Sequence, residues 1–510
     1  MQELHAPAAA AAWLRGHVTG TLRSDSRTVA PGDGFLAWPG AAHDARAHVG
    51  AALAQGAAAC LVERDGADRF ALPDDPRVAG YTGLRTASAL VACAFFDDPS
   101  HALRVIAVTG TNGKTSTAWW LAQALSSARI DPPLPCAMVG TLGIGQPPAA
   151  DAGASDPAPL AATGLTTPDP VLLQASLRRF VDAGLRACAL EASSIGIDEH
   201  RLDGTRVHTA VFTNFTQDHL DYHGSMQAYW QAKTRLFQWP GLAAAVINID
   251  DAKGQALTQL PAVQTLDLWT ISCHAPARLQ AQSISVGETG LEFDVVEGTQ
   301  REHLRTRLIG QYNVNNLLGV IAAMRSLGVP LAQAVGACAE LVPVPGRMQR
   351  LLEAGQPLVA IDYAHTPDAL DKALEALRPV ARQRQGRLWC VFGCGGDRDP
   401  GKRPLMGTAA RSADHVLVTS DNPRSEDPQA IIGQILPALA GHASLHQQAD
   451  RALAIASAIM SAADADVILV AGKGHEDYQE VAGQKRPFSD LAQARAALAR
   501  RRSAAQGVAA

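Results

Sequence analysis

The sequence has 510 residues, of which 47% are hydrophobic and 18% charged, and its formal net charge is −5. This composition excludes a mainly disordered chain, and the length predicts roughly two to four domains, because one hydrophobic core rarely serves so many residues. With no long basic run, nucleic acid is not expected to be the main partner. The sequence has no stretch of about 18 apolar residues, so we expect a cytoplasmic protein without membrane insertion.

Cysteine and lysine usage are both informative. The eight cysteines are scattered, and nothing pairs with Cys390 and Cys394 in a zinc-like pattern, which favours reduced, buried thiols. Only seven of the 44 basic residues are lysines, at positions 114, 233, 253, 372, 402, 473 and 485. A lysine kept in an arginine-rich sequence indicates a position where an ammonium group is chemically needed, although chance is the alternative for any one of them.

Residues 1–101 are predicted to form a small α/β unit. Residues 33–38 leave a turn as a short strand, residues 49–59 form an alanine-rich helix, and residues 60–62 form the strand that follows. We place the boundary to the next unit near residues 97–100.

Residues 102–342 are predicted to form a central unit with a mostly parallel sheet and helices on both faces. A buried strand at 103–109 leads into a glycine-containing loop and a helix at 116–128. A loop rich in proline, alanine and glycine at 130–162 is interpreted as a flexible insertion. The further elements are strands at 187–191, 209–213 and 244–248, an antiparallel region at 280–310 and a helix at 313–327.

Residues 343–510 are predicted to form a third, Rossmann-like α/β unit. Its strands are expected at 358–362, 388–392, 415–419 and 467–471. Each strand precedes polar or glycine-rich residues, and open α/β sheets bind their ligands at this end of the strands. The tail after Ala492 is expected to be a helix that fades into disorder.

The sharpest chemical signal is the strand, loop and helix around residues 110–115. Glycines at 110 and 113 let backbone N–H groups close around phosphate oxygens, and the helix N-terminus adds its dipole. Lys114 supplies a positive charge for the β- and γ-phosphates, and the Thr115 hydroxyl suits Mg²⁺. The loop is shorter than a standard Walker A loop, since Val108 stands where the first glycine would be. The alternative is an ordinary strand-to-helix turn. The loop predicts ATP binding by Gly110, Thr111, Asn112, Gly113, Lys114, Thr115 and Ser116.

Two further strand ends carry acidic or histidine residues. Glu191 ends a strand in the right place for a second metal ligand, although a glutamate at such a position is more often a surface residue. Residues 213–224 also follow a strand and are dense in histidine and aspartate. They are candidates for binding a metal ion or phosphate, and spacing alone does not separate these two interpretations from a structural one.

Seven segments of the sequence carry a combined signal. They are 110–115, 191–194, 218–224, 310–316, 345–348, 362–367 and 421–424. Together they resemble the Mur ligases, and among them the MurE type, which adds diaminopimelate to a UDP-linked muramyl dipeptide. The resemblance runs from about residue 22 to residue 490. It implies a UDP-muramyl substrate-binding domain at 1–101, a P-loop-type ATP-binding domain at 102–342 and an amino-acid-binding domain at 343–510.

The resemblance implies that ATP phosphorylates a substrate carboxylate and that an incoming amine then displaces phosphate. Positioning and charge neutralisation should carry such a reaction. By this resemblance, Lys114 contacts the transferred phosphate and His365 lies near the phosphates. The residues implied to hold ATP are the loop residues with Asn316, Arg347 and Asp362, and those implied to serve Mg²⁺ are Thr115, Glu191 and His219.

Lys233 matches the lysine that the family carbamylates. Addition of CO₂ would turn a cation into a carboxylate-like anion that can orient a second Mg²⁺. Arginine cannot do this, which agrees with the scarcity of lysine. Without the resemblance, Lys233 would be interpreted as a surface lysine on a helix.

Two more groups of residues match substrate contacts of the family. A bidentate arginine suits the distal carboxylate of meso-diaminopimelate, and an acidic residue suits its distal ammonium. Ile195 and Glu199 depart from the common pattern of histidine and glutamine, and segment 40–44 departs from its usual form. The matches for UDP-N-acetylmuramoyl-L-Ala-D-Glu are Ser24, Ser26, Thr166, Thr167, Ser193, Glu199 and Arg201. The matches for diaminopimelate are Arg398, Asp421, Asn422, Pro423, Arg424, Gly472 and Glu476.

Two alternatives stay open beside this interpretation. A folylpolyglutamate synthase would share the loop and the acyl-phosphate chemistry, but it would not explain a separate UDP-type first domain or the segment 421–424. A nucleotide-dependent regulatory protein that has lost ligation would not need to keep five residues together, namely Lys114, Glu191, His219, Lys233 and Arg424. A monomer is expected.

Overall fold

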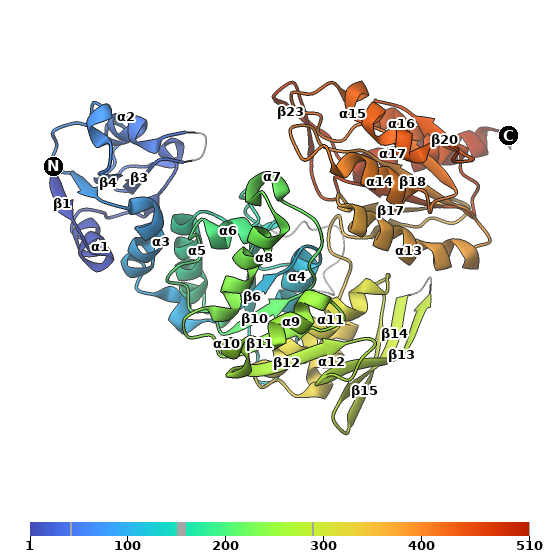
Figure 1. Cartoon of the computed structure of the whole chain (residues 1–510), viewed down its shortest axis with the longest axis horizontal. Helices are drawn as coiled ribbons and strands as arrows, with labels where there is room; N and C mark the ends of the chain where they lie inside the picture. The colour runs from blue at the N-terminus through green and yellow to red at the C-terminus, as the bar shows by residue number, and fades with distance from the viewer. Residues whose placement is uncertain (41–42, 150–159, 288–289, 509–510) are drawn as a thin grey trace.

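Three large β-sheets with their own helices follow one another along the described part of the chain. The computed structural model describes residues 1–510 except 41–42, 150–159, 288–289 and 509–510. Figure 1 shows three bodies, with the N-terminal one in blue, the central one in cyan to yellow and the C-terminal one in orange to red. The predicted α/β fold class with three domains is confirmed, whereas the exact domain boundaries stay predictions.

The N-terminal sheet has five parallel strands in the order β1-β5-β4-β3-β2. The predicted strands at 33–38 and 60–62 are confirmed as β3 and β4. The predicted helix at 49–59 ends early, because Gly56 adopts a left-handed φ of +99° that stops α2. The elements are β1 (Gln2–Leu4), α1 (Pro7–Arg15), β2 (Leu22–Arg23), β3 (Gly34–Ala37), α2 (Val49–Ala54), β4 (Ala59–Glu63), β5 (Val78–Tyr81) and α3 (Leu84–Phe95).

The central sheet has ten strands, and β6 (Arg104–Thr109) lies in its interior between β10 (Thr209–Phe212) and β9 (Ala187–Glu191), all parallel. Ile106 and Val108 join the core on one face of this sheet, and Val105 and Ala107 join the core on the other. Helices therefore cover both faces, as a buried parallel sheet requires.

The other central elements agree with the predicted strands, antiparallel region and helix. The strands are β11 (Ala244–Asn248), β12 (Asp267–Ser272), β13 (Leu279–Gly287), β14 (Gly290–Glu297) and β15 (Gln300–Thr306), the last three forming antiparallel pairs. The helices are α4 (Lys114–Leu125), α5 (Pro170–Asp182), α6 (Ser194–Asp198), α7 (Leu220–His223), α8 (Met226–Thr234), α9 (Ala252–Thr258), α10 (Pro261–Gln264), α11 (Tyr312–Ser326) and α12 (Leu331–Ala339).

The prediction of a flexible insertion over 130–162 is wrong for part of that segment. β7 (Cys136–Gly140) pairs in parallel with β9, and all five of its residues are buried. β8 (Gly143–Gly145) pairs with β7. The prolines before β7 and the glycines after it are typical of a loop, so the short apolar run between them was not predicted to be a strand. Residues 150–159 of the same segment lie outside the described residues.

The C-terminal sheet has six strands in the order β16-β17-β21-β18-β19-β20, and all but β16 run in parallel. The four predicted strands are confirmed. The strands are β16 (Gln349–Leu351), β17 (Leu358–Asp362), β18 (Leu388–Phe392), β19 (His415–Val418), β20 (Leu445–Gln447) and β21 (Val467–Ala471), with a hairpin of β22 (Tyr478–Val481) and β23 (Gln484–Pro487). The helices are α13 (Pro367–Gln383), α14 (Lys402–Ala410), α15 (Pro428–Ile435), α16 (Arg451–Ser461) and α17 (Asp490–Val508).

Two sequence expectations about the ends and surfaces are tested by this structure. The helix expected after Ala492 is confirmed as α17, which continues to Val508 and buries Ala497 and Leu498 against the C-terminal core, and residues 509–510 lie outside the described residues. All eight cysteines are free thiols, and Cys273 alone among them is only half-buried. Within the described ranges, no helix is long and apolar enough to cross a membrane.

Candidate active site

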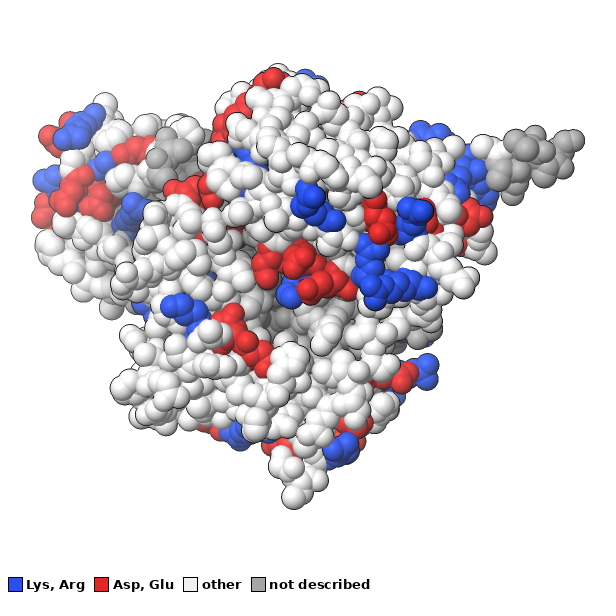
Figure 2. All heavy atoms as spheres, turned by 45° about the vertical axis from the view of Figure 1, so that its right-hand side comes forward, with Lys and Arg blue, Asp and Glu red and all other residues white. Residues whose placement is uncertain are grey.

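The carboxyl ends of the central strands face the C-terminal unit across a cavity of about 940 Å³. The loop after β6, the end of β9 and the segment after β10 all line this cavity, together with residues that follow β17 and β21 of the C-terminal sheet. Asp250, Asp251 and Asp368 also line it. Figure 2 shows acidic side chains, with basic ones beside them, gathered near the middle of one face.

The phosphate-loop candidate has backbone conformations that only glycine accepts easily. Gly110 and Gly113 have φ values of +147° and +86°. A Cβ atom at Gly110 would lie 1.9 Å from Oγ1 of Thr213, and one at Gly113 would lie 2.5 Å from Oδ1 of Asn316. The loop therefore packs tightly between two neighbours. The backbone N–H groups of Thr111 and Asn112 donate to Asn214, and residues 113–117 at the N-terminus of α4 line the cavity.

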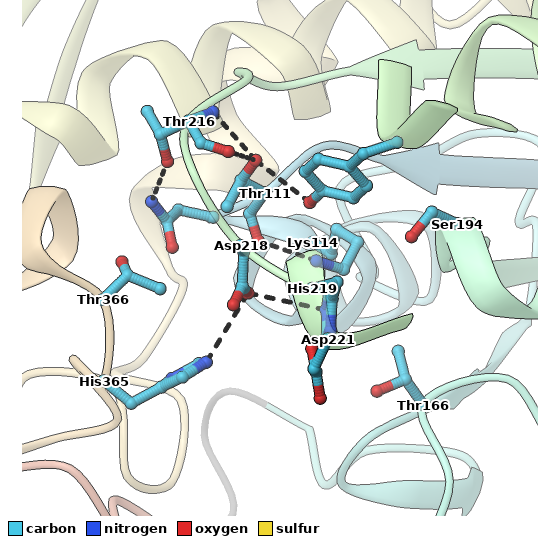
Figure 3. Close-up of polar contacts among 12 residues, drawn as sticks. Thr111, Lys114, Thr166, Ser194, Thr216, Asp218, His219, Asp221, His365 and Thr366 are labelled. Atoms are coloured by element: carbon cyan, nitrogen blue, oxygen red, sulfur yellow. Dashed lines mark hydrogen bonds and ion pairs between the residues drawn. The ribbon is translucent and has the colours of Figure 1, made fainter. Parts of the chain in front are cut away.

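Lys114 folds back over this loop. Its Nζ donates to the carbonyl oxygens of Gly110 at 2.9 Å and Thr111 at 2.8 Å. Figure 3 shows Lys114 beside Thr111 and near His219. Burial lowers the pKa of Lys114, while Glu191 and Asp218 oppose that shift. An ammonium held by carbonyl oxygens can move to phosphate oxygens, which are stronger acceptors.

Glu191 is a fully buried carboxylate at the end of β9. Its Oε2 accepts hydrogen bonds from Oγ1 of Thr115 at 2.9 Å and Oγ1 of Thr141 at 3.2 Å, and its Oε1 accepts from the backbone N–H of Thr141 at 2.8 Å. Burial raises its pKa, against the attraction of Lys114. The interpretation of Glu191 as a surface residue is thereby wrong, and the carboxylate lies beside the predicted magnesium ligand Thr115.

Lys233 is not a surface lysine. It lies on α8 with 1% exposure, and its Nζ donates to the carbonyl oxygen of Gly110 at 2.7 Å. The Nζ also lies 4.5 Å from the centre of the Tyr229 ring. Burial, together with repulsion from Lys114, lowers the pKa of Lys233 well below its ordinary value. The side chain approaches the loop from behind and does not line the cavity.

Asp218, which belongs to the predicted segment 213–224, is the centre of a charged cluster that also draws side chains from the C-terminal unit. Its Oδ2 lies 3.5 Å from Nε2 of His219 and 3.8 Å from Nε2 of His365, and its Oδ1 accepts from Nζ of Lys402 at 3.0 Å. Figure 3 shows both histidines pointing toward Asp218. Burial raises the pKa of Asp218, but the histidines and Lys402 outweigh burial and lower it. Burial lowers the pKa of His219 to about 4, so this imidazole is neutral at neutral pH.

The predicted nucleotide residues of the C-terminal unit also reach this cavity. Arg347 donates through Nη2 to Oγ1 of Thr115 at 3.2 Å, and its guanidinium lies 4.3 Å from the centre of the Tyr363 ring. Asp362 accepts from the backbone N–H of Met348 at 2.6 Å, and burial raises its pKa. Tyr363 is a cavity residue that no motif assigned to a ligand.

The predicted muramyl-peptide residues divide into two groups. Thr167 donates to the carbonyl oxygen of Glu191 at 2.7 Å, and the guanidinium of Arg201 donates to the carbonyl oxygen of Thr167 at 2.7 Å. Glu199 does not line the cavity and instead forms ion pairs with Arg201 and, at 3.6 Å, with Arg85 of the N-terminal unit. The cavity is lined by Thr166, Thr167, Ser193 and Arg201. By contrast, Ser24 and Ser26 lie outside it, next to β2 of the N-terminal unit.

The predicted amino-acid residues gather beyond the ends of β18, β19 and β21. Arg424 has a left-handed φ of +52°, and its Nη1 donates to the carbonyl oxygen of Gly396 at 2.6 Å. Arg398 is exposed and donates to Asp221 of the central unit at 3.2 Å. The cavity is lined by Arg398, Arg424 and Glu476, while Asp421, Asn422, Pro423 and Gly472 lie outside its lining.

Most predicted site residues therefore meet at one cavity, and several further side chains join them. The predicted residues that line it are Thr111 to Ser116, Thr166, Thr167, Glu191, Ser193, Arg201, His219, Asn316, Arg347, Asp362, His365, Arg398, Arg424 and Glu476. Sequence reasoning gave no role of their own to Thr141, Tyr363, Lys402 and His475, and it named Asp218 only as part of segment 213–224. The scarcity of lysine was a usable signal for Lys402. In the described part of the chain, no three His, Cys, Asp or Glu side chains group as a ready metal site.

Comparisons with known proteins agree with this geometry. The Mur ligase middle domain matches residues 108–324, and the Mur ligase glutamate ligase domain matches residues 346–474. A protein of Acidovorax sp. (strain JS42) named UDP-N-acetylmuramoyl-L-alanyl-D-glutamate–2,6-diaminopimelate ligase is 62% identical over 96% of each chain. A solved structure with the same name is 35% identical, with a TM-score of 0.62 over 94% of this chain and 95% of its own.

A more distant solved structure shares only the fold. It is the folylpolyglutamate synthase of Mycobacterium tuberculosis, which is 20% identical, has a TM-score of 0.58 and covers 75% of this chain and 91% of its own. The two domain matches and the 62% identity over nearly the whole chain leave no doubt about the family. This chain belongs to the Mur ligase family.

Proposed function

We propose that the protein is an ATP-dependent ligase that adds meso-2,6-diaminopimelate to UDP-N-acetylmuramoyl-L-alanyl-D-glutamate in the synthesis of peptidoglycan precursors. The observation that carries this proposal is a single cavity shared by the phosphate loop, the buried carboxylate of Glu191 and the oppositely charged side chains of Arg424 and Glu476. Such a cavity suits a reaction that brings a nucleotide, an acid and an amine together. The names of the relatives support the same assignment.

The proposed reaction has two steps. A carboxylate oxygen of the UDP-linked dipeptide attacks the γ-phosphorus of ATP, and ADP leaves. The free amine of diaminopimelate then attacks the acyl carbon, loses a proton and forms the amide bond, while inorganic phosphate leaves with the electrons of the broken C–O bond. Lys114 and the loop N–H groups hold the transferred phosphate, and Arg347 and Asp362 hold the nucleotide.

The residues near the loop fit Mg²⁺. Mg²⁺ is usually held by one or two carboxylates together with phosphates and water. The buried carboxylate of Glu191, the hydroxyl of Thr115 and the neutral imidazole of His219 are the side chains that would hold it. When bound, the ion would neutralise charge on the transferred phosphate.

The environment of Lys233 fits carbamylation by CO₂. Only an unprotonated amine reacts with CO₂, and burial favours the unprotonated form. The carbamate would present oxygen atoms at the base of the loop, as a further ligand for Mg²⁺. Lys114, which lies at the same carbonyl oxygen of Gly110, would offset the new negative charge.

The test is phosphate release from ATP in the presence of UDP-N-acetylmuramoyl-L-alanyl-D-glutamate, with and without diaminopimelate. The proposal expects release that depends on diaminopimelate and a product that contains the new amide bond. Release that depends on L-lysine equally well would overturn the amino-acid assignment. Release that depends on a folate and glutamate would favour the synthase alternative, and nucleotide binding without any amine dependence would favour a regulatory protein.

Three further assignments belong to the same proposal. The nucleotide-activated substrate and ATP are cytoplasmic metabolites, and free thiols are typical of a reducing compartment, so we place the enzyme in the cytoplasm. The complete cavity is built from one chain, which supports action as a monomer. We also keep the predicted domain boundaries at 101/102 and 342/343, and their position between the large sheets supports this proposal.

A further inference from the structure

A buried lysine joins the two segments predicted to bind the amino-acid substrate. Lys473 has no exposed side-chain surface, and its Nζ donates to Oδ1 of Asn422 at 3.0 Å and to Oε2 of Glu476 at 2.9 Å. Nδ2 of Asn422 donates to the same Oε2 at 2.9 Å. The three side chains therefore form a closed ring of hydrogen bonds that ties segment 421–424 to segment 472–476.

Only Glu476 connects this ring to the cavity. Glu476 lines the cavity, whereas Lys473 and Asn422 lie behind it. The ring occupies Oε2 of Glu476 and leaves Oε1 for a ligand. Oδ1 of Asn422 also accepts from the backbone N–H of Glu480 at 2.9 Å, so the ring is anchored to β22. Lys473 thus fixes the direction of the Glu476 carboxylate without reaching the substrate itself.

The charge of Lys473 matters as much as its position. A carboxylate beside a partly buried cavity attracts an ammonium group and repels a second carboxylate, and both effects are stronger than in water. The ammonium of Lys473 offsets the charge of Glu476 at 2.9 Å. meso-Diaminopimelate carries a distal carboxylate that L-lysine lacks. When Lys473 offsets the negative charge of Glu476, the cavity repels the distal carboxylate of diaminopimelate less, and binding of diaminopimelate is favoured over binding of L-lysine.

On the basis of the proposed function, we propose that Lys473 is a positioning residue that determines amino-acid specificity. It aims Glu476 into the cavity and offsets its charge, so that the cavity accepts an amino acid whose far end carries both an ammonium and a carboxylate. Lys473 acts through Glu476 and Asn422 and has no contact with the reacting atoms.

The first test compares Lys473→Met with the wild-type chain. Methionine keeps much of the lysine stem and removes the charge. We expect the ratio of kcat/KM for diaminopimelate to kcat/KM for L-lysine to fall roughly tenfold, as loss of one charge-assisted hydrogen bond implies. The KM values for ATP and the UDP-linked dipeptide should change little. The matched control is Lys485→Met, because Lys485 is exposed and its Nζ lies 4.3 Å from the centre of the same Tyr478 ring that Nζ of Lys473 approaches at 5.4 Å, so that both variants lose an ammonium beside this ring.

The second test removes the charge that Lys473 offsets. Glu476→Gln should weaken the use of both amino acids, but the ratio should move toward diaminopimelate, opposite to its change in Lys473→Met. The double variant, Lys473→Met with Glu476→Gln, should return the ratio toward the wild-type value. A merely structural role of Lys473 predicts no such rescue.

The outcomes separate this inference from the proposed function. If the wild-type chain releases no phosphate in response to diaminopimelate, the proposed function fails. If the wild-type chain is active and Lys473→Met lowers kcat/KM for both amino acids by the same factor, the specificity role is wrong. If Lys473→Met does not fold, the ratio in Glu476→Gln decides, and an unchanged ratio or a shift toward L-lysine overturns the inference.

Discussion

Two lysines share one carbonyl oxygen at the base of the phosphate loop. Gly110 accepts from Nζ of Lys114 at 2.9 Å and from Nζ of Lys233 at 2.7 Å. Two ammonium groups at one oxygen repel each other, and Lys233 is the more deeply buried, so its pKa is lowered well below the ordinary value. In the proposed function, Lys114 would serve as a cation toward phosphate, while Lys233 would react with CO₂.

Replacement of Lys233 tests this division of roles. We expect Lys233→Ala to lower kcat by about 100-fold or more, in the range seen when one preorganised charged group is lost from an active site. Acetate or formate should restore part of the activity by supplying a carboxylate in the vacated space. The control is Lys253→Ala, which removes an exposed lysine that lies over Trp230. A failure of every short carboxylic acid to raise the activity would leave the carbamate without support.

A half-buried histidine at the cavity makes the free energy of unfolding depend on pH. His475 packs against Tyr363, with ring centres 5.4 Å apart, and burial, assisted by Arg347 and Lys473, lowers its pKa to about 3. An unfolded histidine has a pKa of about 6.5, so between these values the unfolded chain binds more protons than the folded one. The stability that the neutral form of His475 contributes to the folded chain is fully present above about pH 6.5 and is lost as the pH falls toward 3.

His475→Gln should therefore make the free energy of unfolding less sensitive to acid. Urea titrations between pH 6.5 and pH 4.5 should show a slope smaller by up to about 1.4 kcal/mol per pH unit than in the wild-type chain. His5→Gln, at an exposed position, should leave the slope unchanged. An equal slope in His475→Gln and the wild-type chain would show that this histidine is protonated alike in both states.

At the scale of elements, the sequence predicted contacts between strand ends of one sheet better than contacts between the central and C-terminal units. Lys114 and Glu191 could be predicted to meet, because carboxyl ends of parallel strands share one edge of a sheet. β7 was missed because prolines and glycines surround its short apolar run. The contact of Lys402 with Asp218 joins positions 184 residues apart in different sheets, and no spacing in the sequence reports how two sheets face each other.

A buried ion pair joins α16 to α17 next to segments 421–424 and 472–476, which are predicted to bind the amino-acid substrate. Arg451 and Asp490 both have no exposed side-chain surface and are joined at 2.7 Å. Arg451 also donates to the carbonyl oxygens of Ser420 and Ala471, which directly precede Asp421 and Gly472. The same guanidinium therefore holds the ends of β19 and β21 in place.

Removal of one partner of this pair should be costly. We expect Arg451→Met to lower the free energy of unfolding by about 3–5 kcal/mol, because Asp490 is left buried without its counter-ion. Urea titration followed by circular dichroism measures this change. The control is Arg502, which lies on α17 as Asp490 does and forms an exposed ion pair with Glu353. Arg502→Ala should lower the free energy of unfolding by less than about 1 kcal/mol. Similar costs for the two variants would show that the buried pair does not hold this edge of the sheet.

At the scale of the whole molecule, a few polar contacts connect the central unit to the C-terminal unit across the cavity. Lys402 meets Asp218 at 3.0 Å, and Arg398 meets Asp221 at 3.2 Å. Nδ2 of Asn112 in the phosphate loop donates to Asp368 of α13 at 3.0 Å. The relative position of the two units therefore depends on charges placed around the nucleotide site, where ATP itself would add contacts to both units.

In the absence of nucleotide, Lys402→Met should let the central and C-terminal units move apart. The carboxylate of Asp218 would keep only the more distant His219 and His365, so the closed arrangement loses its shortest ion pair. Small-angle X-ray scattering should give a larger radius of gyration for Lys402→Met than for the wild-type chain, and ATP with Mg²⁺ should reduce the difference. Added salt should expand the wild-type chain in the same direction, because it screens exposed and partly buried pairs. Arg305→Met, which breaks an exposed pair with Glu292 inside the β14–β15 hairpin, is the matched control. Equal scattering profiles for the three chains at low salt would show that packing, and not the Asp218 cluster, holds the units together.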